Sequence, residues 1–170
     1  MQARNIKKTI GAAGLLVVIA LIGVFWLGSD NQAAAVPRDS NGEMYDVTVY
    51  RDDNCGCCIV HGDYLSDRGY KVEQVDVEGT EGLETIKDEY DVPEELTSCH
   101  TTVVNDGKYV IEGHIPTEAV DKLLSERPEI KGIGMPGMPS GSPGMSGAKT
   151  EAWDIQQINQ DGSLQLFKSI

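Results

Sequence analysis

The sequence has few positively charged residues. It contains 14 lysine and arginine residues against 27 aspartate and glutamate residues, which gives a formal net charge of −13. Arg4, Lys7 and Lys8 precede the first apolar run, so the chain beyond that run carries −16. This balance excludes nucleic acid as a partner, because phosphate binding needs a basic surface. An acidic surface would attract cations such as metal ions, although it can also serve solubility alone.

Cysteine is also scarce, and it is unevenly distributed. The chain has four cysteines, three of them in Cys55-Gly56-Cys57-Cys58 and the fourth at Cys99. They are too few and too clustered for a disulfide scaffold that staples distant parts of a fold. A domain of about 100 residues can bury its own core without such staples. A cysteine cluster of this kind is more typical of a metal site or a redox site.

Long apolar runs are limited to one, the uncharged stretch 10–27. It nearly spans a bilayer core, and the basic residues before it predict a cytoplasmic N-terminus. We expect residues 1–28 to be a membrane anchor, or alternatively a signal peptide cleaved near Ala33-Ala34-Ala35. Residues 29–45 would be a tether, and residues 46–170 a periplasmic or extracellular domain. There, exposed thiols persist only if they are ligated, paired or cycled.

The hydrophobic patterns of this domain alternate between strand and helix periods. Two strands joined by a helix suggest a parallel pair with a right-handed crossover. Asn105-Asp106-Gly107-Lys108 predicts a hairpin in which Gly107 has a positive φ. The expected order is strand 46–50, helix 59–68, strand 71–77, helix 82–90, strands 101–104 and 109–112, and helix 117–127. We therefore predict an α/β fold, a thioredoxin-like mixed sheet with flanking helices, plus the N-terminal transmembrane helix.

The expected fold would bring the two cysteine segments together. In thioredoxin-like proteins the cysteine motif begins the first helix, and the loop leading into the hairpin packs against it. Cys99 lies in that loop, so we expect it beside Cys55, Cys57 and Cys58. Thioredoxins usually place a cis-proline in this loop, whereas the present loop, Thr97-Ser98-Cys99-His100, has no proline.

The end of the chain contains a biased segment and a hairpin pattern. Residues 132–147 are rich in methionine, proline and glycine, and we expect a loop that holds neither a helix nor a central strand. Residues 152–167 form two alternating segments around Asp161-Gly162, which predicts a hairpin that adds edge strands to the sheet.

The cysteine chemistry leaves several functions open. Cys55 and Cys58 form a C-x-x-C pair at a helix N-terminus, where thiolates are stabilised for disulfide exchange or for binding a soft metal. Cys57 and Cys99 favour ligand chemistry, because a third sulfur beside an exchanging pair invites scrambling. Adjacent cysteines should diverge and fit one tetrahedral zinc ion poorly, whereas thiolates bridging several Cu(I) ions suit them. Copper is therefore preferred to zinc, an iron–sulfur cluster or pure disulfide redox chemistry.

Histidines and methionines extend the set of candidate ligands. His100 adjoins Cys99, and His114 follows the predicted hairpin, so both could assist the cysteines. His61 shares a helix face with Cys57 and Cys58, although a histidine there is more commonly packed or partly exposed than a ligand. The predicted loop offers three thioethers that suit Cu(I), although methionine is more commonly a packing residue. These are Met135, Met138 and Met145.

Four sequence blocks together resemble the CopG family of periplasmic copper-resistance proteins, a metal-binding family long described as a domain of unknown function. The blocks lie within Val47–Phe167. They are Cys55-Gly56-Cys57-Cys58, Ser98-Cys99-His100-Thr101, Val110-Ile111-Glu112-Gly113-His114-Ile115-Pro116, and Met135-Pro136-Gly137-Met138-Pro139 with Gly141-Ser142-Pro143-Gly144-Met145. The resemblance implies a thioredoxin-like fold, a cysteine-bound copper site and a role in handling excess copper, and it is compatible with redox work on copper.

The resulting hypothesis is an exported, membrane-anchored protein that binds Cu(I) through Cys55, Cys57, Cys58 and Cys99. His100 and His114 would assist, and the methionine-rich loop would cover or feed the site. Its partners would be metal ions, the membrane and other exported copper-handling proteins. The alternatives are a thiol–disulfide oxidoreductase that uses Cys55 and Cys58, and a zinc or iron–sulfur binding module.

Overall fold

The computed structural model describes residues 37–170 of the chain. The expected anchor or signal at residues 1–28, and residues 29–36 of the expected tether, lie outside these residues. Within residues 37–170, no helix is both long enough and apolar enough to cross a membrane.

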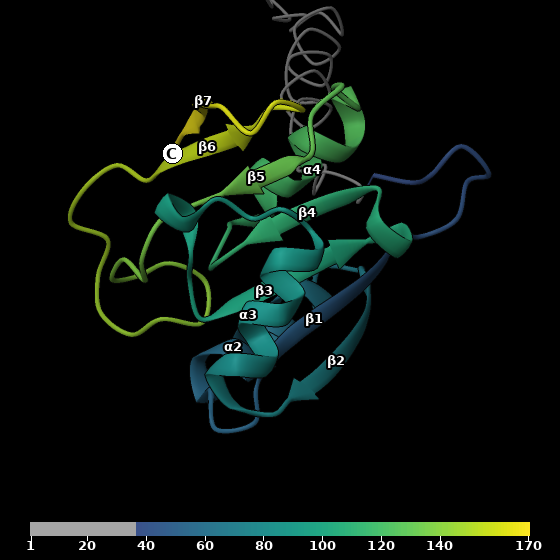
Figure 1. The fold of residues 1–170 in the computed structure, drawn as a ribbon. Helices are drawn as coiled ribbons and strands as arrows, with labels where there is room; N and C mark the ends of the chain where they lie inside the picture. Colours follow the sequence, from purple (N-terminus) through teal and green to yellow (C-terminus); the bar gives the residue numbers. More distant parts are fainter. Residues whose placement is uncertain (1–36) are drawn as a thin grey trace, which may run out of the picture. The chain divides into compact units, whose positions relative to one another are not determined.

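The described part of the chain is a mixed α/β fold with a seven-stranded sheet (Figure 1). Its elements alternate between strands and helices through the first half, as the sequence predicts. The strands are β1 (Asp46–Asp52), β2 (Lys71–Val77), β3 (His100–Val104), β4 (Tyr109–Glu112), β5 (Gly132–Gly134), β6 (Asp154–Ile158) and β7 (Leu164–Ser169). The helices are α2 (Gly56–Ser66), α3 (Gly79–Glu89) and α4 (Thr117–Glu126), with short 3-10 turns at Glu94–Leu96 and Asn105–Gly107.

The strand order is β2-β1-β3-β4-β5-β6-β7. β1 and β2 are parallel, and β3 runs antiparallel to both β1 and β4. The predicted parallel pair and the predicted hairpin are therefore both confirmed. Gly107 has the expected positive φ of 103°, and Asn105 and Asp106 share the left-handed region with φ of 43° and 53°. This arrangement makes β1 a central strand and directs its C-terminal end toward the cysteine motif.

β5 corrects the expectation that residues 132–147 hold no central strand. Gly132–Gly134 lies between β4 and β6, parallel to β4 and antiparallel to β6. Glycine is what permits this position, because a Cβ added to Gly132 would lie 1.8 Å from the Val110 carbonyl oxygen. Composition alone suggested a loop, whereas the missing side chain lets two backbones approach closely. β6 and β7 pair antiparallel on either side of Asp161-Gly162 and extend the sheet.

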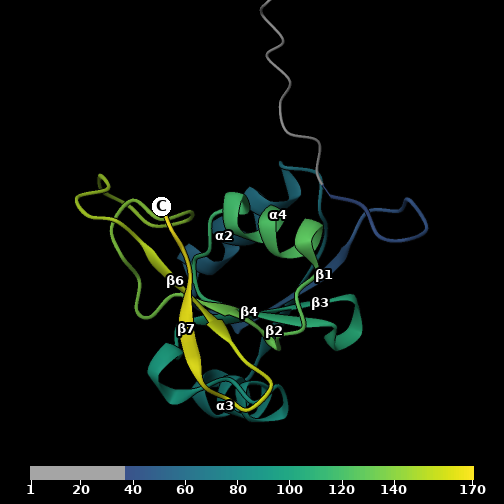
Figure 2. The same ribbon diagram turned by 90° about the horizontal axis from the view of Figure 1, so that it is seen from above.

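Helices cover both faces of the sheet. Figure 2 shows α2 and α4 on one face and α3 on the other. The larger core cluster lies beneath α2 and α4, and includes Leu65, Leu123, Val49 and Ile133. Burying each such side chain contributes on the order of 1.5–3 kcal/mol to folding. This core fixes α2 on the sheet, and with it the cysteines in the first turn of α2.

Candidate metal centre

The N-terminus of α2 carries three of the four cysteines. Cys55 is the N-cap residue, and its carbonyl oxygen accepts the backbone N–H groups of Cys58 and Ile59. Cys57 and Cys58 follow in the first turn. Cys55 and Cys58 form a disulfide, with their Cα atoms 5.3 Å apart. The motif is therefore held at a helix end where thiolate charge is favoured once the disulfide is reduced.

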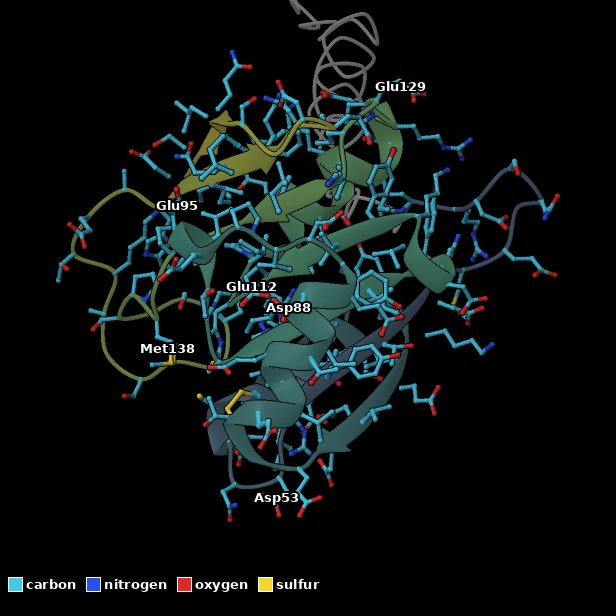
Figure 3. The ribbon with its side chains drawn as sticks, in the orientation of Figure 1. Asp53, Asp88, Glu95, Glu112, Glu129 and Met138 are labelled. Carbon is cyan, nitrogen blue, oxygen red and sulfur yellow. A yellow bond between two sulfur atoms is a disulfide. The ribbon has the colours of Figure 1, made fainter. Side chains whose placement is uncertain are left out.

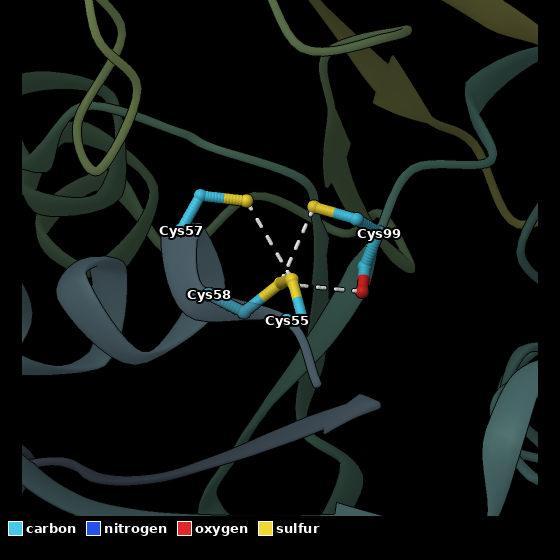
Figure 4. Close-up of side chains that lie close together, drawn as sticks. All are labelled: Cys55, Cys57, Cys58 and Cys99. Atoms are coloured by element: carbon cyan, nitrogen blue, oxygen red, sulfur yellow. Dashed lines mark hydrogen bonds between the residues drawn. A yellow bond between two sulfur atoms is a disulfide. The ribbon is translucent and has the colours of Figure 1, made fainter. Parts of the chain in front are cut away.

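Cys99 lies directly opposite this motif, as the predicted topology requires (Figure 4). Its Sγ atom is 3.4 Å from Sγ of Cys58, while Sγ of Cys57 is 3.6 Å from Sγ of Cys55. The four Sγ atoms all lie within 4.8 Å of one another. The expected divergence of Cys57 and Cys58 does not keep their sulfur atoms apart, because Cys57 turns back toward Cys55. The geometric argument against a single tetrahedral ion is therefore wrong.

All three histidines of the chain gather behind Cys99. His114 Nε2 is 3.0 Å from the Cys99 sulfur, and His100 Nδ1 is 3.6 Å from it. The His61 ring centroid lies 4.6 Å from that of His100 and 5.3 Å from that of His114. Each histidine is at least 99% buried. Cys58, Cys99, His100 and His114 thus offer a second set of ligand atoms within 4.8 Å, which shares two sulfur atoms with the first set.

One backbone carbonyl sets the tautomers of two of these histidines. The Pro143 oxygen lies 3.2 Å from His61 Nδ1 and 2.7 Å from His114 Nδ1. A carbonyl oxygen can only accept, so both Nδ1 atoms carry the proton. The Nε2 atom of each neutral ring then has the free lone pair. For His114 this lone pair faces Cys99, which is the orientation that a metal ligand or a thiol acceptor requires.

Burial keeps the three imidazoles neutral. Burial, with His114 as a second cause, lowers the pKa of His61 to about 3. Burial also lowers the pKa of His114, and it lowers that of His100 well below its usual value, with the other two histidines adding to the effect. Near neutral pH, no ring proton therefore competes with a metal ion for the lone pairs. The Nε2 atom of His100 is buried without a hydrogen-bond partner.

The Cys99 thiol is protonated in the absence of metal. Burial raises its pKa to about 12, and the neighbouring Cys57 adds to the increase. A thiolate is the form that binds metal or attacks a disulfide, so either reaction must first remove this proton. In the metal-free protein the thiol can donate a hydrogen bond to His114 Nε2, which lies 3.0 Å away.

The three candidate methionines are placed very differently. Met135 is buried in the main core, which is the more common role of a methionine. Met138 is half exposed and is labelled at the edge of the molecule in Figure 3. Met145 is partly buried and follows Gly144, whose added Cβ would lie 2.5 Å from the Cys57 carbonyl oxygen. The loop therefore does cover the cysteine motif, and Met145 is the methionine next to the contact.

Sequence patterns missed two features of the site. The Pro143 carbonyl was not predicted, because backbone acceptors have no sequence signature. The second feature is a buried ion pair between Lys87 and Glu112 beneath the Cys99 segment. Glu112 stood within a block already singled out, but only the fold reveals that a lysine 25 residues earlier faces it.

The fold and the site define a small mixed α/β protein with a cysteine–histidine cluster that could hold a metal ion. Thiolates and neutral imidazoles are soft or intermediate ligands, which suit copper, zinc or an iron–sulfur cluster better than calcium or magnesium.

Comparison with known proteins identifies a family within this class of small cysteine–histidine α/β proteins. The family described as "Protein of unknown function, DUF411" matches residues 96–145, which contain Cys99, His100 and His114. A solved structure named "Copper resistance protein copG- Form 2" is 34% identical, with a TM-score of 0.67, and the match covers 75% of this chain and 99% of that one. Form 1 is 32% identical, with the same TM-score, and the match covers 75% and 98%. A search of curated proteins gave no match. The chain belongs to the CopG family, which confirms the resemblance seen in the sequence.

Proposed function

We propose that the protein binds copper as Cu(I) through Cys55, Cys57, Cys58 and Cys99, with His100 and His114 assisting, and that it serves copper resistance. The observation that carries the proposal is the convergence of four sulfur atoms within 4.8 Å, in a chain that belongs to the CopG family. The solved relatives are named copper resistance proteins.

The donor set supports copper on chemical grounds. Soft thiolates bind Cu(I) strongly, and sulfur atoms this close together can bridge several ions. Bound copper would supply one-electron redox chemistry between Cu(I) and Cu(II). The chain supplies neutral imidazoles, a covering loop and a helix N-terminus that stabilises thiolates. The Cys55–Cys58 disulfide must be reduced before all four sulfur atoms are available.

The fold is proposed to be thioredoxin-like. Strands β2-β1-β3-β4, with β3 antiparallel to its neighbours and helices on both faces, have the order expected for that fold. β5, β6 and β7 would then be an addition that carries the covering loop. We further propose that the N-terminal segment anchors the domain on the periplasmic or extracellular side, where other exported copper-handling proteins would exchange metal with it.

The direct test is anaerobic titration of the reduced full-length chain, in mild detergent, with Cu(I), and in parallel with Zn²⁺. Metal analysis and thiol counting on the same sample give the stoichiometry and the number of protected cysteines. Several copper ions per chain with all four thiols protected would support the proposal. Tight binding of a single zinc ion in preference to Cu(I), or no binding of either metal, would refute it.

A thiol–disulfide oxidoreductase is the second candidate, and the Cys55–Cys58 disulfide is the observation that favours it. Cys57→Ala separates the two functions, because exchange through Cys55 and Cys58 needs no third sulfur. In the copper protein this substitution should lower Cu(I) stoichiometry and affinity. In an oxidoreductase, the rate of exchange with a model disulfide should remain at the parent level.

A further inference from the structure

A buried ion pair lies beneath the segment that carries Cys99. Lys87 belongs to α3 and Glu112 ends β4, and their side chains are 6% and 0% exposed. Glu112 is labelled in Figure 3, where it lies near α3. It shares its side of the sheet with Val110, since the two residues are two positions apart on one strand.

Each oxygen of the Glu112 carboxylate is used. Oε1 accepts the backbone N–H of Ser98 at 2.6 Å and pairs with Lys87 Nζ, while Oε2 accepts the Thr101 hydroxyl at 2.7 Å. Lys87 Nζ also donates to Thr101 Oγ1 at 3.1 Å. Apart from the Lys87–Glu112 ion pair, all of these hydrogen bonds involve Ser98, which precedes Cys99, or Thr101, which follows His100.

Backbone hydrogen bonds also join the C-terminal end of β4 to its neighbouring segments. The Gly113 N–H donates to the His100 carbonyl oxygen at 3.2 Å, and the Met135 N–H donates to the Glu112 carbonyl oxygen at 3.1 Å. Gly113 has φ of 82°, and an added Cβ would lie 2.9 Å from Ser98 Oγ. The segment leading to His114 is thus packed closely against the one carrying Cys99, and Glu112 joins the two.

Stability alone does not account for this arrangement. Desolvating two charges costs several kcal/mol per ion, so a buried ion pair is often no more stable than two apolar side chains of similar size. What an apolar pair could not provide is the acceptor for the Ser98 N–H and the Thr101 hydroxyl. The loop also has no proline to stiffen its backbone.

We propose that Lys87 and Glu112 are positioning residues that hold the Cys99 sulfur against Cys58 and His114. Glu112 fixes the backbone on both sides of the Cys99-His100 pair, and Lys87 balances the charge of the buried carboxylate. This role concerns the geometry of the thiols, so it goes beyond copper binding and does not depend on it.

The test measures how closely Cys58 and Cys99 are held, with no metal present. In the full-length chain carrying Cys55→Ser and Cys57→Ser, only Cys58 and Cys99 remain. The equilibrium between their thiols and their disulfide against glutathione gives the effective concentration of one thiol at the other. In this background, Lys87→Met with Glu112→Leu removes the hydrogen bonds and leaves no unpaired charge. We expect the effective concentration to fall by at least about tenfold, because small misplacements of reacting atoms are costly.

The matched variant, Lys87→Met with Glu112→Gln, keeps an acceptor oxygen and should restore most of the effective concentration. Leu124→Ala is the control for stability, because it opens a cavity in the core at the far end of α4. It should lower the midpoint of urea denaturation and leave the thiol equilibrium of the folded protein unchanged. An unchanged equilibrium in the Glu112→Leu variant, or an equal fall in Leu124→Ala, would overturn the proposal.

Cu(I) titration of the same variants with all four cysteines present keeps the two proposals apart. A parent protein that binds no copper, together with a fall in effective concentration in the Glu112→Leu variant, counts against the proposed function and for the positioning role. A copper-binding parent whose Glu112→Leu variant keeps the parent thiol equilibrium counts against the positioning role alone.

Discussion

His61 is placed where a charged histidine would be strongly disfavoured. It is 1% exposed, its ring lies near two other imidazoles, and its Nδ1 proton is used by the Pro143 carbonyl. A positive charge at this position would be poorly solvated and would face two more rings. Neutrality of the cluster is therefore a condition of the native fold.

Acidification should destabilise the metal-free protein at mildly acidic pH. The pKa of His61 falls from 6.5 in the unfolded chain to about 3 in the native fold. The unfolded state then binds more protons between these values, so stability is complete above pH 6.5 and decreases as pH falls below it. His61 alone should cost about 2 kcal/mol at about pH 5 relative to about pH 8. Urea denaturation of the metal-free protein at both values measures the loss.

The matched variant is His61→Leu, which removes the titrating group but keeps a buried side chain. Its stability should vary less between the two pH values than that of the parent. If the parent and His61→Leu lose the same free energy on acidification, His61 is not the group responsible.

At the scale of elements, the segment 139–147 acts as the cover of the cysteine motif. It reaches the first turn of α2 at Gly144, whose added Cβ would lie 2.5 Å from the Cys57 carbonyl oxygen and 3.2 Å from His114 Nδ1. The close approach of two backbones is possible because Gly144 has no side chain and has φ of 88°. This approach is also what delivers the Pro143 carbonyl to both histidines.

Gly144→Ala should displace the segment from the site. The substitution adds a clash with backbone to the strain of a positive φ, for a cost on the order of 1–3 kcal/mol in strain alone. Losing the Pro143 acceptor should free the His61 and His114 rings, which NMR of the imidazole protons would reveal. Gly137→Ala is the control, since it has φ of 69° but open space around its Cβ. Identical imidazole spectra for Gly144→Ala and the parent would contradict the assigned contact.

At the scale of the whole molecule, the surface is dominated by carboxylates. The chain beyond the apolar run carries −16, and within residues 37–170 the basic side chains form six ion pairs. Most of these pairs are exposed at one partner or both, where they contribute little. Repulsion among the surplus carboxylates therefore opposes the compact state.

Added salt should stabilise the fold by screening this repulsion. Raising sodium chloride from about 0.02 M to about 0.5 M should increase the free energy of unfolding by on the order of 1 kcal/mol. The measurement is urea denaturation, because urea carries no charge of its own. Potassium chloride should give the same increase. A decrease in stability with either salt would mean that the ion pairs outweigh the repulsion.

Local patterns predicted those parts of the structure that depend on local physics. β2 and β4 have the expected bounds. Cys99 lies beside Cys58, as expected, because the order of elements places the segment before β3 next to the N-terminus of α2. The features that the sequence patterns predicted wrongly depend on close approach between segments that are distant in the sequence. Gly132 enters the sheet because it has no side chain to clash with the Val110 carbonyl oxygen. Met135 then follows β5 into the main core, where its N–H donates to the Glu112 carbonyl oxygen. The Lys87–Glu112 pair and the Pro143 carbonyl likewise depend on contacts that no local pattern encodes.

The disulfide between Cys55 and Cys58 makes the proposed metal site conditional on its surroundings. Half of the sulfur ligands become available only after two electrons enter the chain. Apparent copper affinity would then follow the redox poise of the compartment, by about a factor of ten for each 30 mV over the range in which the disulfide is mostly oxidised. The site would act as a coincidence detector that loads metal only where a reductant and copper are present together.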